Sequence, residues 1–283
     1  MNIEQYGIYI LYTLIYVVLA VVLKYALNFR SLSDYNADEQ LAGGNLAVGL
    51  RRTGAQFGLA IAVTGVLSSS GADDLLADLF NTASYGFIAV VFMLSSLLIT
   101  DRLVLPGVNN QESLKQGNVA VGFVEFGMLV ATGIVAYSSM VGEGGGMLSS
   151  LSYFIAGQIT LVALVIVYEK IFVRNFDIVE AIGNNNTASG IYLGGKMIAY
   201  SLILKSAIAG NGTSELPVDL ALEFLAVAAL GMIFLYLFES ILDRLIVTSA
   251  NLSSMLNKDS IVPAVQLASA KIGIALILSN AIL

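Results

Sequence analysis

The sequence predicts an all-α integral membrane protein with eight transmembrane helices, built from four parallel two-helix repeats with both termini outside. First, 57% of the 283 residues are hydrophobic and only 12% are charged. Second, several apolar runs reach the roughly 18 residues that a helix needs to cross a bilayer core of about 30 Å. Third, a short motif recurs where apolar runs begin. No stretch alternates like a barrel strand, so helices are favoured.

The spans are expected, in order, at residues 8–28, 45–67, 84–101, 118–141, 151–172, 186–209, 218–238 and 261–282. The first run is read as a span because no basic region precedes it and Leu23-Lys24-Tyr25 is not a small-residue cleavage site. Glycine, serine, asparagine and acidic residues mark the loops between runs. Pro106 and Pro217 fit the ends of spans, and Pro263 fits the first turn of the eighth.

Basic residues predict the orientation. They cluster in or beside alternate loops, at Lys24, Arg30, Arg102, Lys115, Lys170, Arg174, Arg244 and Lys258. The other loops carry almost only acids, at Asp73, Asp74, Asp78, Glu143 and Glu215. Because cytoplasmic loops are enriched in lysine and arginine, the first set is predicted to be cytoplasmic and both termini to lie outside.

An Asn-x-Ala-x-Gly motif opens three of the spans, beginning at Asn45, Asn118 and Asn186. Each motif ends in a glycine, at Gly49, Gly122 and Gly190. Six residues before each asparagine is a glutamate, at Glu39, Glu112 and Glu180, and nine residues after it is a second glycine, at Gly54, Gly127 and Gly195. A two-span unit returns the chain to its starting side, so the repeats are parallel. Aligning Gly273 with Gly54 places Ala264 at the asparagine position and Lys258 at the glutamate position of a fourth, divergent unit. The halves are predicted at 1–142 and 143–283, joined in the loop 142–146.

The glutamate followed by this motif, at the start of the second helix of a tandem two-span unit, resembles the YjfL-like uncharacterised bacterial inner-membrane family (domain of unknown function 350). The resemblance covers essentially the whole chain, with four units where short members have two. It implies a multi-pass protein of the bacterial inner (cytoplasmic) membrane, and it implies no activity and no catalytic residues.

Helical spacing divides the motif into two faces. Ala47 and Gly54 lie on a face of small residues that lets helices approach closely. The opposite face, together with one deep lysine, forms a candidate polar path of Asn45, Arg52, Gln56, Asn118, Glu125, Asn186, Lys196 and Lys271. The three groups Arg52, Glu125 and Lys271 are predicted at one depth, about 10 Å into their spans. If four units surround a common axis, Glu125 meets Arg52, Lys271 or both.

Each of these residues also has a structural interpretation. Asparagine is a preferred helix N-cap, and a glutamate near a helix start is commonly structural. The deep charges form either a register-fixing ion pair or a charged constriction in a permeation path. Lys196 either pairs with an acid or carries protons, and Arg51 is expected to reach the headgroups. Glu239 is expected at the interface. The doublet Asp101-Arg102 and its counterparts 169–170 and 243–244 are expected to bridge repeats or anchor at headgroups.

The residue inventory limits the function. Cysteine and histidine are absent, which argues against thiolate chemistry, haem, iron–sulfur clusters and ordinary zinc sites. No catalytic motif occurs, so we expect no enzyme, no cofactor and no metal. Two hypotheses stay open: a channel or transporter for a small ion or polar solute, and a non-conducting membrane scaffold or envelope-stress partner protein. The expected partners are the lipid bilayer, with a membrane or cytoplasmic protein and a homo-oligomer both possible, and no nucleic acid.

Overall fold

The computed structural model describes residues 3–68, 74–141, 146–172, 176–209, 217–246 and 252–281, and contains only helices and their connections in these ranges. The long helices are α1 (Ile3–Ser31), α3 (Leu46–Ser68), α4 (Leu75–Ile99), α6 (Val119–Met140), α7 (Gly146–Phe172), α9 (Thr187–Ala209), α10 (Pro217–Ile246) and α12 (Ile261–Ala281). The short helices are α2 (Ala37–Ala42), α5 (Asn110–Lys115), α8 (Ile178–Gly183) and α11 (Leu252–Asn257), and a π-helical turn, Thr100–Val104, follows α4.

Seven of the expected spans coincide with candidate membrane-spanning helices. Among the described residues, seven helices are long and apolar enough to cross a membrane, and α3 is not one of them. Helix α3 has a similar length, 23 residues, but carries Arg51 and Arg52 in its second turn. Its span therefore stays a prediction. Helix α4 begins nine residues earlier than expected, at Leu75 instead of residue 84, because Asp74 is extended and the residues after it are helical. The predicted joint at 142–146 lies outside the described residues except for Gly146.

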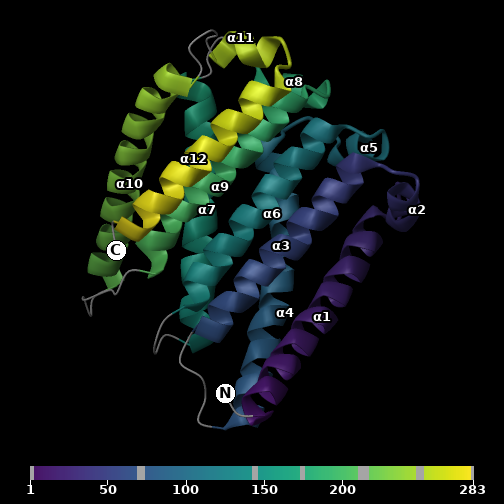
Figure 1. Ribbon diagram of the computed structural model, residues 1–283, viewed down its shortest axis with the longest axis vertical. Helices are drawn as coiled ribbons and strands as arrows, with labels where there is room; N and C mark the ends of the chain where they lie inside the picture. The colour runs from purple at the N-terminus through teal and green to yellow at the C-terminus, as the bar shows by residue number, and fades with distance from the viewer. Residues whose placement is uncertain are drawn as a thin grey trace.

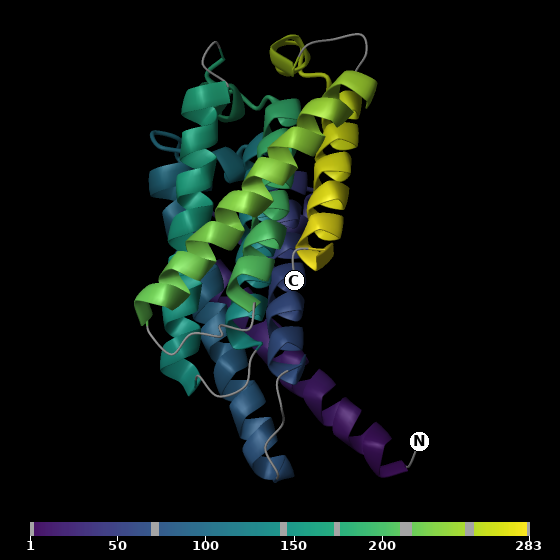
Figure 2. The ribbon, with the colours of Figure 1, turned by 90° about the vertical axis from the view of Figure 1, so that its left-hand side faces the viewer.

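The long helices form two layers. One layer is a row in the order α3, α6, α9 and α12, in which each helix packs mainly on the next; we call these the row helices. Helices α4, α7 and α10 each lie against two successive row helices, whereas α1 packs on α4 and on α3 (Figure 1). Figure 2, turned by 90°, separates α7 from α12 and shows the N-terminal part of α1 extending away from the bundle. The row has two ends, so its helices do not surround a common axis.

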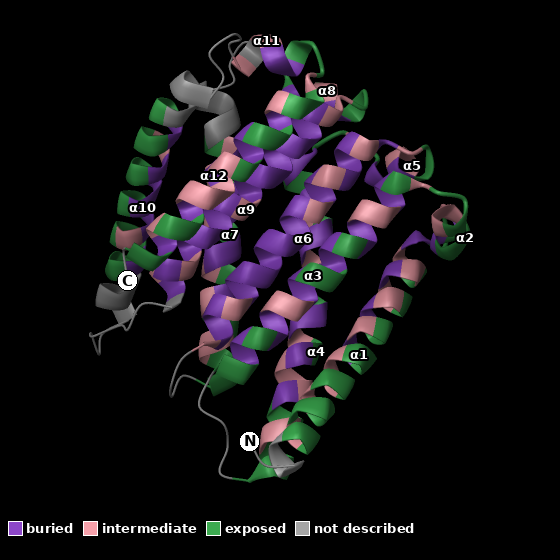
Figure 3. Ribbon diagram, viewed as in Figure 1, coloured by how far each residue is buried: buried purple, intermediate pink, exposed green. Residues whose placement is uncertain are grey.

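The repeated glycines hold the row together. A Cβ on Gly54 would lie 2.6 Å from Cα of Phe126 in the next helix, and a Cβ on Gly122 would lie 2.9 Å from Cα of Ala47 in the preceding one. Gly127 meets Gly194 in the same way. The small-residue face therefore brings backbones into contact, as predicted. Consequently α6 and α9, with a row neighbour on both sides, are the most buried helices (Figure 3).

The short helices explain the motif glutamates. Asn36, Asn109 and Asp177 cap α2, α5 and α8, and their side chains accept hydrogen bonds from the backbone N–H of Glu39, Glu112 and Glu180, respectively. Each glutamate is therefore the third residue of a capped helix, the position that closes a capping box. In α2 the Asn36 amide also donates to Glu39 Oε1, at 2.8 Å. The Glu112 side chain likewise accepts a hydrogen bond from Gln116 at 2.8 Å, so local contacts support a structural role for Glu39 and Glu112.

The backbone has the same local conformation before all four row helices, and this shifts the alignment expected for the last of them. Gly44, Gly117, Asn185 and Asp259 all have positive φ, each directly before a row helix or its cap. Directly after them, Asn45, Asn118, Asn186 and Ser260 donate equivalent backbone hydrogen bonds to the preceding short helix. Ser260, not Ala264, therefore holds the asparagine position. The expected alignment was wrong by four residues, one helical turn, because it relied on the glycine at Gly273; Ser269 lies where Gly54 does.

Candidate functional site

The first buried charge cluster joins α3 to α6. Arg51 donates through Nε to Glu125 Oε2 and through Nη2 to Glu125 Oε1, at 2.8 Å. Nη1 of the same guanidinium donates to Tyr35 Oη at 3.1 Å and to Gln111 Oε1 at 2.9 Å. The Glu125 side chain is fully buried and that of Arg51 is 2% exposed. This fork geometry matches a carboxylate at two points, which makes the pair a specific clamp between neighbouring row helices.

The arginine that meets Glu125 is not the one expected. Arg52 turns toward α1 and α2, where it donates to Asn28 Oδ1 and, at 3.3 Å, to Asp38 Oδ1. Arg51 was expected at the headgroups and is instead among the most buried side chains. The physical reason is the row: α6 lies on the side of α3 that carries Ala47 and Gly54, and Arg51 is on that side. Lys271 does not meet Glu125 either.

A second buried cluster joins α9, α10 and α12. Lys196 Nζ and Lys271 Nζ lie 3.3 and 3.1 Å from the same oxygen, Oε2 of Glu239. Both lysine side chains are 1% exposed and that of Glu239 is 4% exposed, so all three are buried between helices. The depth of Glu239 in the membrane, expected at the interface, stays a prediction. Burying charges is tolerated only when they are paired, and a shared carboxylate provides the pairing.

Tyrosines surround the second cluster. The Lys196 ammonium lies 5.5, 5.7 and 5.4 Å from the ring centroids of Tyr192, Tyr200 and Tyr236, and the Lys271 ammonium lies 5.2 Å from that of Tyr192. The hydroxyls of Tyr200 and Tyr236 are hydrogen-bonded at 2.8 Å. Ring faces attract ammonium groups, so the tyrosines further stabilise buried positive charge.

The motif asparagines bind across unit boundaries. Each caps its own row helix by accepting a backbone N–H, that of Val48, Val121 or Ser189. Each amide nitrogen also donates to the next short helix: Asn45 to Leu114 O, Asn118 to Ile182 O and Asn186 to Leu256 O, at 2.8, 2.9 and 2.7 Å. The capping interpretation is thus supported, and the amides additionally tie consecutive units together.

The candidate polar residues therefore do not line one path. The three asparagines lie at helix starts, Arg52 faces α1, and the Gln56 side chain is exposed on the outer face of α3. Glu125 belongs to the first cluster, and Lys196 and Lys271 belong to the second.

Polar links also join the ends of α1 and α4. Arg30 pairs with Asp101, which also accepts a hydrogen bond from Asn110 at 2.7 Å, so this member of the predicted acid–base doublets bridges repeats. The side chains at 169, 170, 174, 243 and 244 lie outside those described. Between α1 and α2, burial raises the pKa of the Tyr35 hydroxyl, although the nearby Arg51 charge opposes the rise. The hydrogen bond from Lys24 lowers the pKa of Asp38 below its ordinary value.

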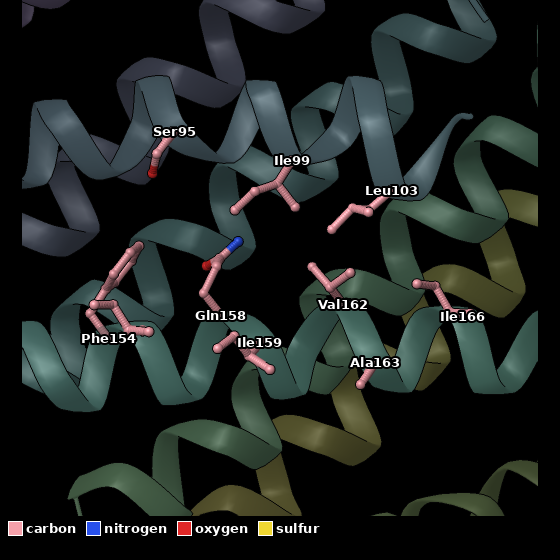
Figure 4. A pocket seen from close by; sticks show the side chains of 10 residues that line it. Ser95, Ile99, Leu103, Phe154, Gln158, Ile159, Val162, Ala163 and Ile166 are labelled. Atoms are coloured by element: carbon pink, nitrogen blue, oxygen red, sulfur yellow. The ribbon is translucent and has the colours of Figure 1, made fainter. Parts of the chain in front are cut away.

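A cavity of about 360 Å³ lies between α4 and α7, apart from both clusters. Its lining is apolar except for Ser95 and Gln158, and Figure 4 shows the Gln158 carboxamide between the two helices. Ile155 and Ile159 of the lining are exposed on the outer surface.

Several residues of the clusters escaped prediction. Tyr192 and Tyr200 lie four residues before and after the predicted Lys196, on the same helix face, and Tyr236 is spaced to share a face with Glu239. These spacings are a usable signal for the second cluster. By contrast, Tyr35 and Gln111 come from connections between spans, and nothing in their local sequence indicates a buried arginine partner.

In the part of the chain that the structure describes, all regular elements are helices, and seven of them are long and apolar enough to cross a membrane. The protein is therefore a polytopic, multi-pass membrane protein. The chain belongs to the family described as Domain of Unknown Function (DUF350), whose model matches residues 1–140 and again residues 144–282. It is therefore a tandem member of that family.

A relative from Aquifex aeolicus (strain VF5), described as a UPF0719 transmembrane protein, is 25% identical over 260 residues, which cover 89% of this chain and 94% of the relative. No solved structure matches the chain significantly.

Proposed function

We propose that this protein is a non-conducting scaffold of the bacterial inner membrane, without enzymatic activity. In this proposal, eight spans form four parallel units, and the short helices α2, α5, α8 and α11 lie on the cytoplasmic side with both termini outside. The basic residues Lys24, Arg30, Arg102, Lys115 and Lys258, all near the short-helix end, support this orientation. The exposed parts of the short helices offer repeated, similar surfaces to a membrane or cytoplasmic partner.

The pairing of the buried charges carries the proposal. Arg51 and Glu125 bind each other between two row helices whose backbones touch, and Lys196 and Lys271 share Glu239 between three helices. A permeation path needs polar groups along one continuous route through the membrane. Here the candidate groups divide between two separate clusters and the outer faces, and their geometry serves to join helices.

Flux measurements test the scaffold. The purified protein in proteoliposomes is expected to pass H⁺, Na⁺, K⁺ and Cl⁻ no faster than empty liposomes under imposed gradients and across a range of pH. A flux that Glu125→Gln or Lys196→Met abolishes, in protein that still folds, would overturn the proposal.

One observation favours transport as a second candidate. Two lysines on one carboxylate within a tyrosine-lined site form a group of exchangeable protons inside the membrane. Such a site would move a proton or a small anion rather than a metal cation, because two ammonium groups face one carboxylate. A proton flux lost in Lys271→Met and Glu239→Gln, but kept in Arg52→Met, would favour this candidate.

A further inference from the structure

The outer faces of the two end helices of the row differ from the inner faces. Gly122 and Gly190 press on the backbone of the preceding row helix, but a Cβ on the equivalent Gly49 would meet only the Leu41 side chain, at 3.8 Å. At the other end, a Cβ on Gly273 would have nothing within 4 Å. Within the described ranges, α3 and α12 therefore each have one face that resembles the helix-packing faces of the inner row helices but contacts no row helix.

Both outer faces carry polar side chains at membrane depth. On α3 these are Thr53, Gln56 and Thr64, and on α12 they are Gln266, Ser269 and Asn280; all six residues are exposed. Four of them, Thr53, Thr64, Ser269 and Asn280, donate hydrogen bonds to backbone carbonyls of their own helices. In membrane proteins serine, threonine, asparagine and glutamine are also common at contacts between helices. Their position suits a protein neighbour better than acyl chains.

The two faces match in register. Positions can be counted in each row helix from the residue that holds the asparagine position. Gly54 and Gly127, both at position 9, contact Phe126 and Gly194, which are at position 8 of the next row helix. Continuing the row with this rule places Ser269 of α12 opposite Thr53 of an α3. The rule that brings Gly65 onto Tyr137 likewise places Asn280 opposite Thr64. The threonines Thr53 and Thr64 thus fall opposite Ser269 and Asn280, two polar pairs along the same contact.

Helix α1 leaves space for the missing neighbour. Helices α4, α7 and α10 each contact two successive row helices, whereas α3 is the one row helix that α1 packs on, and less extensively. A groove of about 300 Å³ separates α1 from α3, with Tyr9 and Tyr12 on one wall and Ala60 and Thr64 on the other. By equivalence with α4, this groove is where a further row helix would lie.

We propose that a second copy of this chain fills the site, with its α12 against the α3 of the first copy. The interface would continue the row of α3, α6, α9 and α12, and it deepens the proposed scaffold function by naming the chain itself as a partner. Because the contact joins two different faces, it is head-to-tail, and repetition gives a closed ring or a filament.

Cysteine cross-linking tests this geometry without background, since the chain contains no cysteine. Thr53→Cys and Ser269→Cys, with different tags, are co-expressed and oxidised in native membranes. A cross-linked dimer is expected only when both variants are present. Ile159→Cys, on the exposed face of α7, replaces Thr53→Cys in the matched control and is expected to give no dimer.

Two results would overturn the proposal. Cross-linking of either variant with itself indicates a symmetric interface. Absence of the mixed dimer, although both cysteines react with a membrane-permeant maleimide, indicates that lipid or another protein covers these faces. As an independent reading, Gly273→Leu is expected to reduce the assembly to monomers on native mass spectrometry with an unchanged unfolding midpoint. The cross-linking result is independent of ion flux. If the assembly conducts ions, the cross-link still forms and only the proposed scaffold function is contradicted.

Discussion

Arg51 of α3 donates hydrogen bonds to both carboxylate oxygens of Glu125 in α6, and both side chains are almost completely buried. The pair lies between helices whose glycines bring their backbones into contact. It therefore fixes the register of two neighbouring row helices, because sliding or rotating one of them would leave a buried charge without its partner.

The Arg51–Glu125 pair is expected to be strongly coupled. Arg51→Met or Glu125→Gln alone should lower the free energy of unfolding by about 3–5 kcal/mol, because each leaves a buried partner uncompensated. The combined Arg51→Met/Glu125→Leu variant should lose much less than the sum. Arg52→Met is the control, expected to cost about 1 kcal/mol or less, because its partner Asp38 is half exposed. Equilibrium unfolding in mixed micelles, followed by circular dichroism, measures these values; additive losses would contradict the coupling.

Glu239 is expected to be the most sensitive member of the second cluster. Glu239→Gln weakens the interactions of two ammonium groups at once, whereas Lys271→Met removes one of them. Glu239→Gln should therefore lower the unfolding midpoint more than Lys271→Met does. Thermal unfolding in the same detergent compares the two, and an equal or opposite order would show that the carboxylate is not the shared partner.

Asn118 is expected to show two separable roles. Asn118→Ala removes the cap acceptor and the amide donor, and should cost about 1–3 kcal/mol. Asn118→Asp keeps the acceptor for the Val121 N–H but loses the donor to Ile182 O. Hydrogen exchange at the start of α6 should accelerate in the alanine variant and stay slow in the aspartate variant. Equal acceleration in both would contradict the capping role.

Gly127 is expected to tolerate no side chain. A Cβ there would overlap the backbone of Gly194, so Gly127→Ala should separate α6 from α9 and cost about 1–3 kcal/mol. Gly7→Ala in α1 is the matched control, because nothing lies within 4 Å of its Cβ position. Unfolding midpoints that fall equally in both variants would show that close helix approach is not the cause.

The orientation is open to direct labelling. Gln116→Cys lies at the short-helix end and Asp74→Cys at the start of α4, and both residues are exposed. A membrane-impermeant maleimide should label position 116 only in inverted vesicles and position 74 only in intact spheroplasts. The reverse pattern would place both termini in the cytoplasm.

Local pattern was sufficient to predict most of the fold. Apolar run length predicted the long helices, and the pairing of Ala47 with Gly54 on one face predicted their close packing. It was insufficient for the fourth unit, because the row-helix start depends on the positive φ of Asp259 and the cap at Ser260, neither of which resembles the asparagine motif.

The candidate site was less predictable for a physical reason. Which of Arg51 and Arg52 is buried depends on the side of α3 on which the neighbouring helix lies. That side is different in a row of helices and in a ring around a common axis. Spacing along α3 gave the 100° between the two arginines but not the position of α6. Similarly, Glu239 is near one end of its apolar run, and only the packing of α10 on α9 and α12 buries it.

A structure in lipid nanodiscs, resolved well enough to place ordered water, tests most directly the claim that the buried charges join helices. The account predicts that Arg51 and Glu125 contact each other directly, that Glu239 contacts both lysines, and that no continuous file of water connects either cluster to the two membrane surfaces. A water file that passes Glu125 or Glu239 and reaches both surfaces would contradict it.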